Sequence, residues 1–369
     1  DLLDRFFEQE NIEIGHKDVV AITESVVART QGNYVTIDQV AKDLNPDFAG
    51  KELGVILPIL SRNRFAIVLR AIASADLEKV ILQLSLPSDE VGNHLITLDQ
   101  LDNAGINPWR ETISEAKYRE LFGYQKHEFT GIDYVAYYKE LVEDCGKKCE
   151  IIFSNDPLAI LAHTKYVINC DIHTRKRTKN LLLKNGAECV RSLDDIMNAP
   201  IDGSGYNEKY GLLGSNKSTE AQIKLFPREC SPLVEAIQAE VKKRTGKTIE
   251  VMVYGDGAFK DPVGKIWELA DPVVSPGYTS GLEGTPNELK LKYLADNDFK
   301  DLRGDELKEA IKEAIKSKSD NLVGQMATQG TTPRQLTDLL GSLCDLTSGS
   351  GDKGTPVVYI QGYFDNYTN

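Results

Sequence analysis

The stretch EIIFSNDPLAILAHTKYVINCDIHTRKRTKNLLLKNGAECV, residues 150–190, decides the fold class of this chain. Short apolar runs rich in β-branched residues alternate in it with segments whose apolar residues recur at helical spacing. The expected strands are Glu150–Ser154, Tyr166–Asp171 and Cys189–Val190, and the expected helices between them are Leu158–Thr164 and Thr174–Asn185. Such alternation predicts right-handed crossovers and a small parallel sheet. We therefore expect an α/β fold.

The rest of the chain shows a less regular mixture of helices and strands, which is typical of an α+β core. A Gly- and Ser-rich stretch, Asp202–Glu220, ends the alternation and indicates a boundary or a binding loop. We expect two domains: a discontinuous mixed α+β core of residues 1–76 and 205–369, and an inserted βαβ-type α/β domain of residues 77–204. The other expected helices are Leu2–Gln9, Arg62–Ala75, Asp133–Glu143, Ser231–Thr245, Glu288–Asp296, Asp305–Ser317 and Pro333–Cys344, and the other expected strands are Asp18–Thr23, Val80–Leu84, Ile249–Tyr254 and Pro356–Gln361.

Composition limits the classes of partner. The 369 residues carry a formal net charge of −13, and such an acidic surface repels nucleic acids and anionic membranes, so neither is expected. The longest apolar runs, such as Val55–Leu60 and Val80–Leu84, are far too short to cross a bilayer, and no signal-peptide pattern is visible. The six cysteines are scattered, which favours reduced thiols and a cytoplasmic location.

The segment VMVYGDGAFKDPVGK, Val251–Lys265, is the first candidate site. An apolar strand runs directly into Gly-Asp-Gly and places Asp256 at the carboxyl end of a strand, where ligands bind in open α/β sheets. The flanking glycines let the backbone approach a ligand closely. Lys260, Asp261 and Lys265 follow, and this mixture of charges suits a metal ion and phosphate oxygens. The alternative is a tight Asp-Gly turn with solvated charges.

A glycine-rich loop near the end of the chain is the second candidate site. It lies in LTSGSGDKGTPVV, Leu346–Val358, where Gly351, Asp352 and Lys353 precede an apolar strand. Closely spaced glycines allow backbone N–H groups to surround an anion. The pattern matches neither the P-loop nor the dinucleotide fingerprint. A flexible connection into the last strand is the alternative interpretation.

The third candidate is LLGSNKSTE, Leu212–Glu220, where Asn216 and Lys217 precede a segment that Ser218 or Thr219 could cap. A helix that begins here would offer free N–H groups to an anion. Caps of this kind are also common without any ligand.

The fourth candidate, CDIHTRKRTK at Cys170–Lys179, follows an expected strand and opens an expected helix. Basic residues at a helix start oppose the helix dipole, which would be relieved by a bound anion. A solvated basic face is the alternative. The five histidines show no metal-site or triad spacing, and we expect no catalytic role for them.

Three regions, in order along the chain, resemble the coenzyme F-420 γ-glutamyl ligase family. They are KDVVAITESVVARTQGNY (Lys17–Tyr34), the pair GSNKSTEAQIKLFP (Gly214–Pro227) and TGKTIEVMVYGDG (Thr245–Gly257), and LTSGSGDKGTPVVYIQG (Leu346–Gly362). The resemblance covers roughly residues 1–75 and 205–369, whereas residues 77–204 have no obvious counterpart and look like an insertion.

The resemblance implies an enzyme that joins L-glutamate to a small-molecule carboxylate acceptor with GTP or ATP and Mg²⁺ or Mn²⁺. It also implies a homodimer. The residues implied for nucleotide binding are Ser25, Arg29 and Asn216, to which we add Lys217 and the loop residues Gly351, Asp352 and Lys353. Asp256 matches a metal-ligand aspartate, and with Lys260 and Asp261 it forms the expected catalytic group, in which Asp261 orients a second ion.

This chain departs from the family pattern at several metal-site positions. The family's other metal aspartate falls at Leu213 or Gly214, its threonine after the second aspartate is Gly257, and the ligand in its last loop falls near Ser350. A site that has lost ligands could serve a different purpose. The alternative function is therefore a non-catalytic nucleotide- or metabolite-binding protein on the same scaffold.

Overall fold

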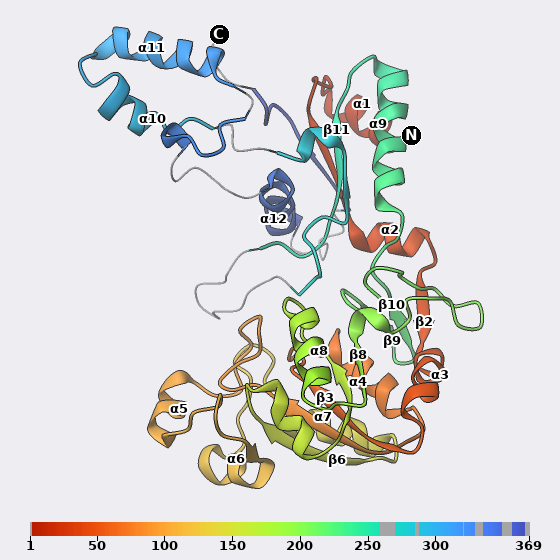
Figure 1. Ribbon diagram of the computed structural model, residues 1–369. Coiled ribbons are helices and arrows are strands. Elements are labelled where there is room, and N and C mark those ends of the chain that lie inside the picture. Colours follow the sequence, from red (N-terminus) through yellow and green to blue (C-terminus); the bar gives the residue numbers. More distant parts are fainter. Residues whose placement is uncertain are drawn as a thin grey trace. The chain divides into compact units, whose positions relative to one another are not determined.

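A computed structural model describes residues 2–258, 270–284, 288–319, 321–328, 335–348 and 356–365 (Figure 1). The contacts group the chain into two compact units, both discontinuous in sequence. The first, here called the terminal unit, comprises Asp1–Glu24, Glu229–Gly257 and Val274–Asn369, and the second, the central unit, comprises Ser25–Arg228 and Ala258–Val273.

The central unit contains a six-stranded sheet in the order β5-β6-β4-β3-β7-β8. Its strands are β3 (Lys51–Ile56), β4 (Leu77–Leu84), β5 (Ile113–Ser114), β6 (Lys148–Phe153), β7 (Tyr166–Asn169) and β8 (Cys189–Ser192). All neighbours pair in parallel except β5, which is antiparallel to β6. The expected parallel sheet and the α/β class are therefore confirmed.

Both faces of this sheet are covered, as parallel sheets require. Alternate strand residues point to opposite faces, so Leu82 packs into one apolar cluster and Ile81 into another. The first cluster includes α3 (Ile37–Phe48), α4 (Phe65–Ala73) and α7 (Tyr134–Asp144), and the second includes the 3-10 helix η1 (Pro157–Ala162) and α8 (Arg175–Lys184).

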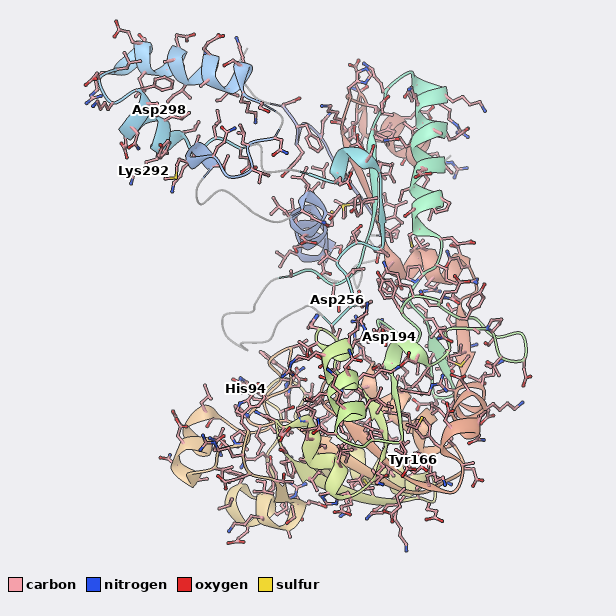
Figure 2. All side chains as sticks on the ribbon, viewed as in Figure 1. His94, Tyr166, Asp194, Asp256, Lys292 and Asp298 are labelled. Atoms are coloured by element: carbon pink, nitrogen blue, oxygen red, sulfur yellow. The ribbon has the colours of Figure 1, made fainter. Side chains whose placement is uncertain are left out.

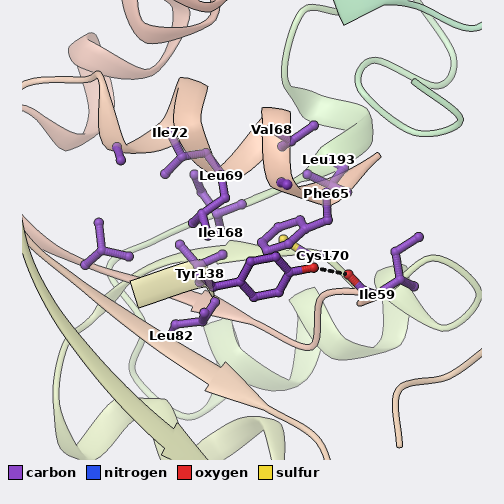
Figure 3. Packing of buried hydrophobic residues seen from close by; sticks show 14 of the residues in the cluster. Ile59, Phe65, Val68, Leu69, Ile72, Leu82, Tyr138, Ile168, Cys170 and Leu193 are labelled. Atoms are coloured by element: carbon purple, nitrogen blue, oxygen red, sulfur yellow. Dashed lines mark hydrogen bonds between the residues drawn. The ribbon is translucent and has the colours of Figure 1, made fainter. Parts of the chain in front are cut away.

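Tyr138 is a central side chain of the larger cluster (Figure 3). It is fully buried, and its ring meets Phe65 edge to face at 5.3 Å. Its hydroxyl donates to the carbonyl of Ile59 over 3.2 Å and accepts the N–H of Ser61 over 2.8 Å. The polar end of the ring is thereby satisfied, and it fixes the loop that follows β3.

Smaller elements complete the central unit. They are α2 (Glu24–Thr30), which follows β1 and begins in the terminal unit, β2 (Tyr34–Thr36), α5 (Leu98–Ala104), α6 (Glu115–Phe122), η2 (Leu193–Asp195), β9 (Asn216–Thr219) and β10 (Gln222–Lys224). Strands β2, β10 and β9 form an antiparallel sheet. Capping boxes begin α3, at Thr36 and Gln39, and α5, at Thr97 and Gln100.

The terminal unit contains a four-stranded sheet in the order β12-β11-β1-β13. Its elements are α1 (Leu2–Glu10), β1 (Val19–Thr23), α9 (Cys230–Thr245), β11 (Glu250–Tyr254), β12 (Gly277–Tyr278), η3 (Ser280–Leu282), α10 (Leu291–Tyr293), the π-helical turn η4 (Leu294–Asp298), α11 (Gly304–Ser317), η5 (Met326–Thr328), α12 (Leu336–Ser348) and β13 (Val357–Ile360). Strand β1 is parallel to β11, whereas β12 and β13 are antiparallel to their neighbours. Helix α12 packs Leu340 and Cys344 against Met252 of β11.

The boundaries of the two compact units differ from the expected domain boundaries. Residues 51–56 fell within the expected core, but they form β3, which pairs with β4 and β7 on either side. A boundary at residue 76 would therefore cut through the centre of the parallel sheet. Residues 150–190 do not pair with residues 250–254, which belong to the terminal sheet.

Two local expectations also need correction. The segment that Ser218 or Thr219 was expected to cap is not a helix start, because residues 216–219 form β9 and pair with β10. The expected helix at Leu158–Thr164 is a 3-10 helix that begins with Pro157, and the Asp156 side chain accepts the N–H of Leu158. No helix within the described ranges is both long and apolar enough to span a bilayer.

Candidate functional site

The carboxyl ends of β1 and β11 meet at one edge of the terminal sheet. The two strands are parallel, with Thr23 opposite Tyr254 at the last paired position. Strand β13 runs the other way, so its first residues lie at the same edge, and the N–H of Thr23 donates to the carbonyl of Pro356 over 3.0 Å. Asp256 follows β11 after a single glycine (Figure 2). Three stretches selected from the sequence therefore reach one edge, where α/β sheets bind ligands.

Backbone hydrogen bonds hold the Gly-Asp-Gly motif on both sides of Asp256. The N–H of Gly255 donates to the carbonyl of Val274, and the N–H of Gly257 donates to Asp345 Oδ2, each over 2.8 Å. Asp345 is 4% exposed, whereas Asp256 is half-buried. The motif therefore has a fixed backbone, and the Asp256 carboxylate is partly open to solvent.

Asp345 is a residue that the sequence interpretation missed. The expected helix stopped at Cys344, but α12 continues to Ser348 and places Asp345 in its last turn. Gly341 permits the close packing of α12, since a Cβ there would lie 2.6 Å from a methyl carbon of Val274. A carboxylate in the last turn of a helix is unfavourable because it opposes the helix dipole. This sequence signal could have indicated that Asp345 has a specific role.

The buried thiols near this edge are not nucleophiles. Burial raises the pKa of the Cys344 thiol to about 12, and the neighbouring Asp345 adds to the rise. Burial likewise raises the pKa of Cys230 to about 12, with a smaller effect of Glu24. Both thiols are protonated at neutral pH, and a protonated thiol neither attacks a carbonyl nor binds a metal well.

The described residues do not by themselves complete a metal centre. Asp256 offers one partly exposed carboxylate, and Asp345 beside it accepts an N–H through one oxygen. In the described ranges, no three His, Cys, Asp or Glu side chains lie close enough to hold an ion together. Mg²⁺ takes oxygen ligands and commonly retains several waters, so Asp256 fits one position of such a site.

The residues implied for nucleotide binding that the structure describes belong to the central unit. Ser25 and Arg29 lie one helical turn apart on α2, with Arg29 exposed. Asn216 and Lys217 are the first two residues of β9. The ammonium of Lys217 pairs with Glu220, so its charge is already partly neutralised. Asp256 lies in the other unit.

Two cations of the basic motif at residues 170–179 are paired within the protein. The guanidinium of Arg175 donates to Asp194 over 2.7 Å, and Lys179 pairs with Asp195 over 2.6 Å. Both carboxylates come from η2, directly after β8. These contacts satisfy two of the cations and favour a structural role for them.

The remaining predicted residues lie outside the described ranges. They are Lys260, Asp261 and Lys265 of the first motif and Gly351, Asp352 and Lys353 of the last loop. Their roles stay predictions.

A sequence profile now identifies the family. The profile of the family described as F420-0:gamma-glutamyl ligase matches residues 2–362. The chain belongs to this family. The matched range includes residues 77–204, for which the motif comparison found no counterpart. No curated protein matches the chain, and no solved structure matches it either.

Proposed function

We propose that the protein is a nucleotide-dependent ligase that joins L-glutamate to a small-molecule carboxylate acceptor, with GTP or ATP as co-substrate. The family match across residues 2–362 is the observation that carries this proposal. The meeting of Thr23, Asp256 and Pro356 at one sheet edge supports it, because ligands gather at such an edge. We further propose that it acts in the cytoplasm as a homodimer.

The proposed reaction has two steps. An oxygen of the acceptor carboxylate attacks the γ-phosphorus, the bond to the β,γ-bridging oxygen breaks, and a nucleoside diphosphate leaves. The amine of glutamate then attacks the acyl phosphate, inorganic phosphate leaves, and the nitrogen loses a proton as the amide forms. Such transfers depend mainly on positioning and on neutralisation of phosphate charge.

The proposed roles of the residues follow from the charges of their side chains. When bound, Mg²⁺ or Mn²⁺ would neutralise phosphate oxygens, and Asp256 with Asp261 would hold it. Arg29, Lys217 and Lys260 would contact the phosphates. The bonds from Gly255 and Gly257 support the role of Asp256, since they fix the backbone on both sides of its carboxylate.

The experiment supplies GTP or ATP, Mg²⁺ or Mn²⁺, glutamate and a panel of carboxylate acceptors that includes deazaflavins and folates. Mass spectrometry would detect the glutamyl adduct, and a phosphate assay would follow acceptor-dependent release. We expect both signals together with one acceptor class. Metal-dependent nucleotide binding without adduct or phosphate release would favour the non-catalytic binding protein instead.

A further inference from the structure

The parallel strands of the central unit reverse their order next to β3. Numbered along the chain from β3, the neighbours β6-β4-β3-β7-β8 read 3-2-1-4-5. The chain builds outward from β3 through β4 to β6, and it then returns to the other side of β3 for β7 and β8. In open α/β sheets with this order, ligands bind in the crevice outside the carboxyl ends of the two strands at the reversal. Those strands here are β3 and β7.

A small cavity lies at this reversal. It has a volume of about 30 Å³, and its lining includes Ile59 and Arg64 after β3 and Cys170 and Ile172 after β7. Arg64 donates to Asp271 over 2.8 Å, and the two side chains are 15% and 1% exposed. The cavity therefore has apolar walls, and at its rim the Arg64 cation is paired with a buried carboxylate.

The loop after β4, residues 85–94, forms a strap over the end of β3. Asp89 Oδ2 accepts the N–H of Leu60 from the loop after β3, over 2.6 Å. Glu90 accepts the N–H groups of Ile172, over 2.6 Å, and His173, over 3.3 Å, from the loop after β7. Because β3 lies between β4 and β7, a loop that connects β4 to the loop after β7 passes across the end of β3.

The Glu90 carboxylate occupies the place where the anionic group of a ligand would accept these two N–H groups. Two consecutive backbone N–H groups aimed at one carboxylate form the kind of concavity that binds phosphates and carboxylates. Much of the Glu90 residue is exposed, yet desolvation of its carboxyl group raises its pKa to about 7, and the nearby Asp171 and Asp89 add to the rise. Burial and these two acids disfavour negative charge here, and the N–H groups of Ile172 and His173 offset part of that effect.

Two further unusual features lie at this end of the sheet. Leu57, the first residue after β3, has a φ of +53°, which is a costly conformation for a leucine and is typical of functional loops. Gln83, fully buried near the end of β4, has a carbonyl oxygen for which the described residues supply no hydrogen-bond partner. Its amide nitrogen donates to the carbonyls of Ser154 and Asp156 after β6, so this open acceptor lies on the side of β4 away from β7 and suits a buried water.

We propose that the crevice between the loops after β3 and β7 binds a small anionic metabolite, whose carboxylate or phosphate group displaces Glu90 from the N–H groups of Ile172 and His173. The cavity of about 30 Å³ is far smaller than typical ligand sites, which measure roughly 300–1,000 Å³. The strap must therefore move when the metabolite enters. This site belongs to the central unit alone and does not depend on the proposed ligase activity.

The test uses calorimetry to compare the affinity of the full-length wild type and of Glu90→Ala for each probe. The buffer contains a chelator that removes divalent metals. The probes are inorganic phosphate, adenosine monophosphate and L-glutamate, which separate phosphate from carboxylate recognition. Without the competing side chain, at least one probe should bind about tenfold more tightly than to wild type. Glu78→Ala is the matched control, because Glu78 is an exposed acid at the opposite end of β4.

Amide hydrogen exchange measured by NMR locates the binding. In Glu90→Ala, the N–H groups of Ile172 and His173 should exchange faster than in wild type and should regain protection when the probe is added. If Glu90→Ala does not fold, Glu90→Gln serves instead, since its amide can still accept one of the two N–H groups. Equal affinities in wild type, Glu90 variant and Glu78→Ala, or protection that returns at other amides only, would overturn the proposal.

Discussion

The backbone N–H of Gly257 donates to the buried carboxylate of Asp345 over 2.8 Å, and this bond ties the Gly-Asp-Gly motif to the last turn of α12. The two residues are far apart in sequence, yet both flank the edge where β1 and β11 end. Asp345 does not need to touch a substrate to matter. It positions the backbone that carries Asp256.

Replacement of Asp345 should test this positioning role. Asp345→Ala removes the acceptor of a buried N–H, which should lower the free energy of unfolding by about 1–3 kcal/mol. Asp345→Asn keeps one oxygen acceptor and should lose less. Urea titration measures both, with Asp338→Ala on the same helix as the control. Equal losses for the alanine and asparagine variants would contradict a specific bond to Gly257.

Asp256→Asn should weaken metal-dependent nucleotide binding without a comparable loss of stability. Asp256 is half-buried after β11, and asparagine keeps the size of the side chain, so the loss of stability should stay at about 1 kcal/mol or less. Calorimetry with GTP or ATP, with and without Mg²⁺, measures the binding. Asp305→Asn, an exposed acid in the first turn of α11, is the control for a general charge effect. The metal role of Asp256 fails if the variant and wild type bind nucleotide equally in the presence of metal.

The buried thiols should resist alkylation in the folded protein. Burial raises the pKa of Cys230 and of Cys344 to about 12, and only the thiolate reacts with iodoacetamide. At pH 8 we expect Cys145, which is half-buried, to be modified before the buried Cys230 and Cys344. Peptide mass spectrometry follows each site, and the urea-unfolded chain is the reference in which all thiols react. Rapid modification of Cys344 in the folded protein would show that its helix opens easily.

The sequence alone predicted the parallel sheet because most of its strands carry strong local signals. The run at Tyr166–Asp171, for example, contains β7. Strand β3 was missed, since Gly54 weakens the pattern of KELGVI. The structure explains this glycine: a Cβ at Gly54 would lie 2.4 Å from a side-chain carbon of Ile160, which packs over the strand. That requirement comes from tertiary packing, and no local pattern contains it.

The candidate site likewise contains residues that the sequence could indicate and residues that it could not. Asp256 could be selected because an apolar strand and two glycines surround it in the sequence. Asp345 could not, because its role depends on how α12 packs against β11. The strap is a similar case, since the contact of Glu90 with Ile172 depends on the order of the strands.

Asp89 should be one of the most sensitive positions in the strap. It is 8% exposed, and its carboxylate accepts the N–H groups of Leu60, Val91 and Asn93 together with the Asn93 side-chain amide. In Asp89→Asn, one oxygen becomes an N–H₂ group that faces donors. We expect a loss of about 2–4 kcal/mol in the free energy of unfolding. Asp99→Asn, an exposed acid at the start of α5, should stay within about 0.5 kcal/mol of wild type.

The same residue predicts a dependence of stability on pH. Burial is the largest effect on Asp89, and it raises the pKa to about 6 from an ordinary value of 3.8, despite the hydrogen bonds that favour the carboxylate. Between these two pH values the folded state holds the proton and the unfolded state releases it. The contribution of Asp89 to stability is therefore complete below about pH 4 and is lost as the pH rises through about 6.

The measurement is the difference in the free energy of unfolding between wild type and Asp89→Asn, followed from pH 4 to pH 7. Other groups titrate in both proteins and cancel in this difference. The advantage of wild type should fall by up to about 3 kcal/mol across this range, because each pH unit between the two pKa values is worth about 1.4 kcal/mol. An advantage that grows with pH would mean that the N–H bonds outweigh burial, so that the pKa of Asp89 lies below its ordinary value in the folded protein.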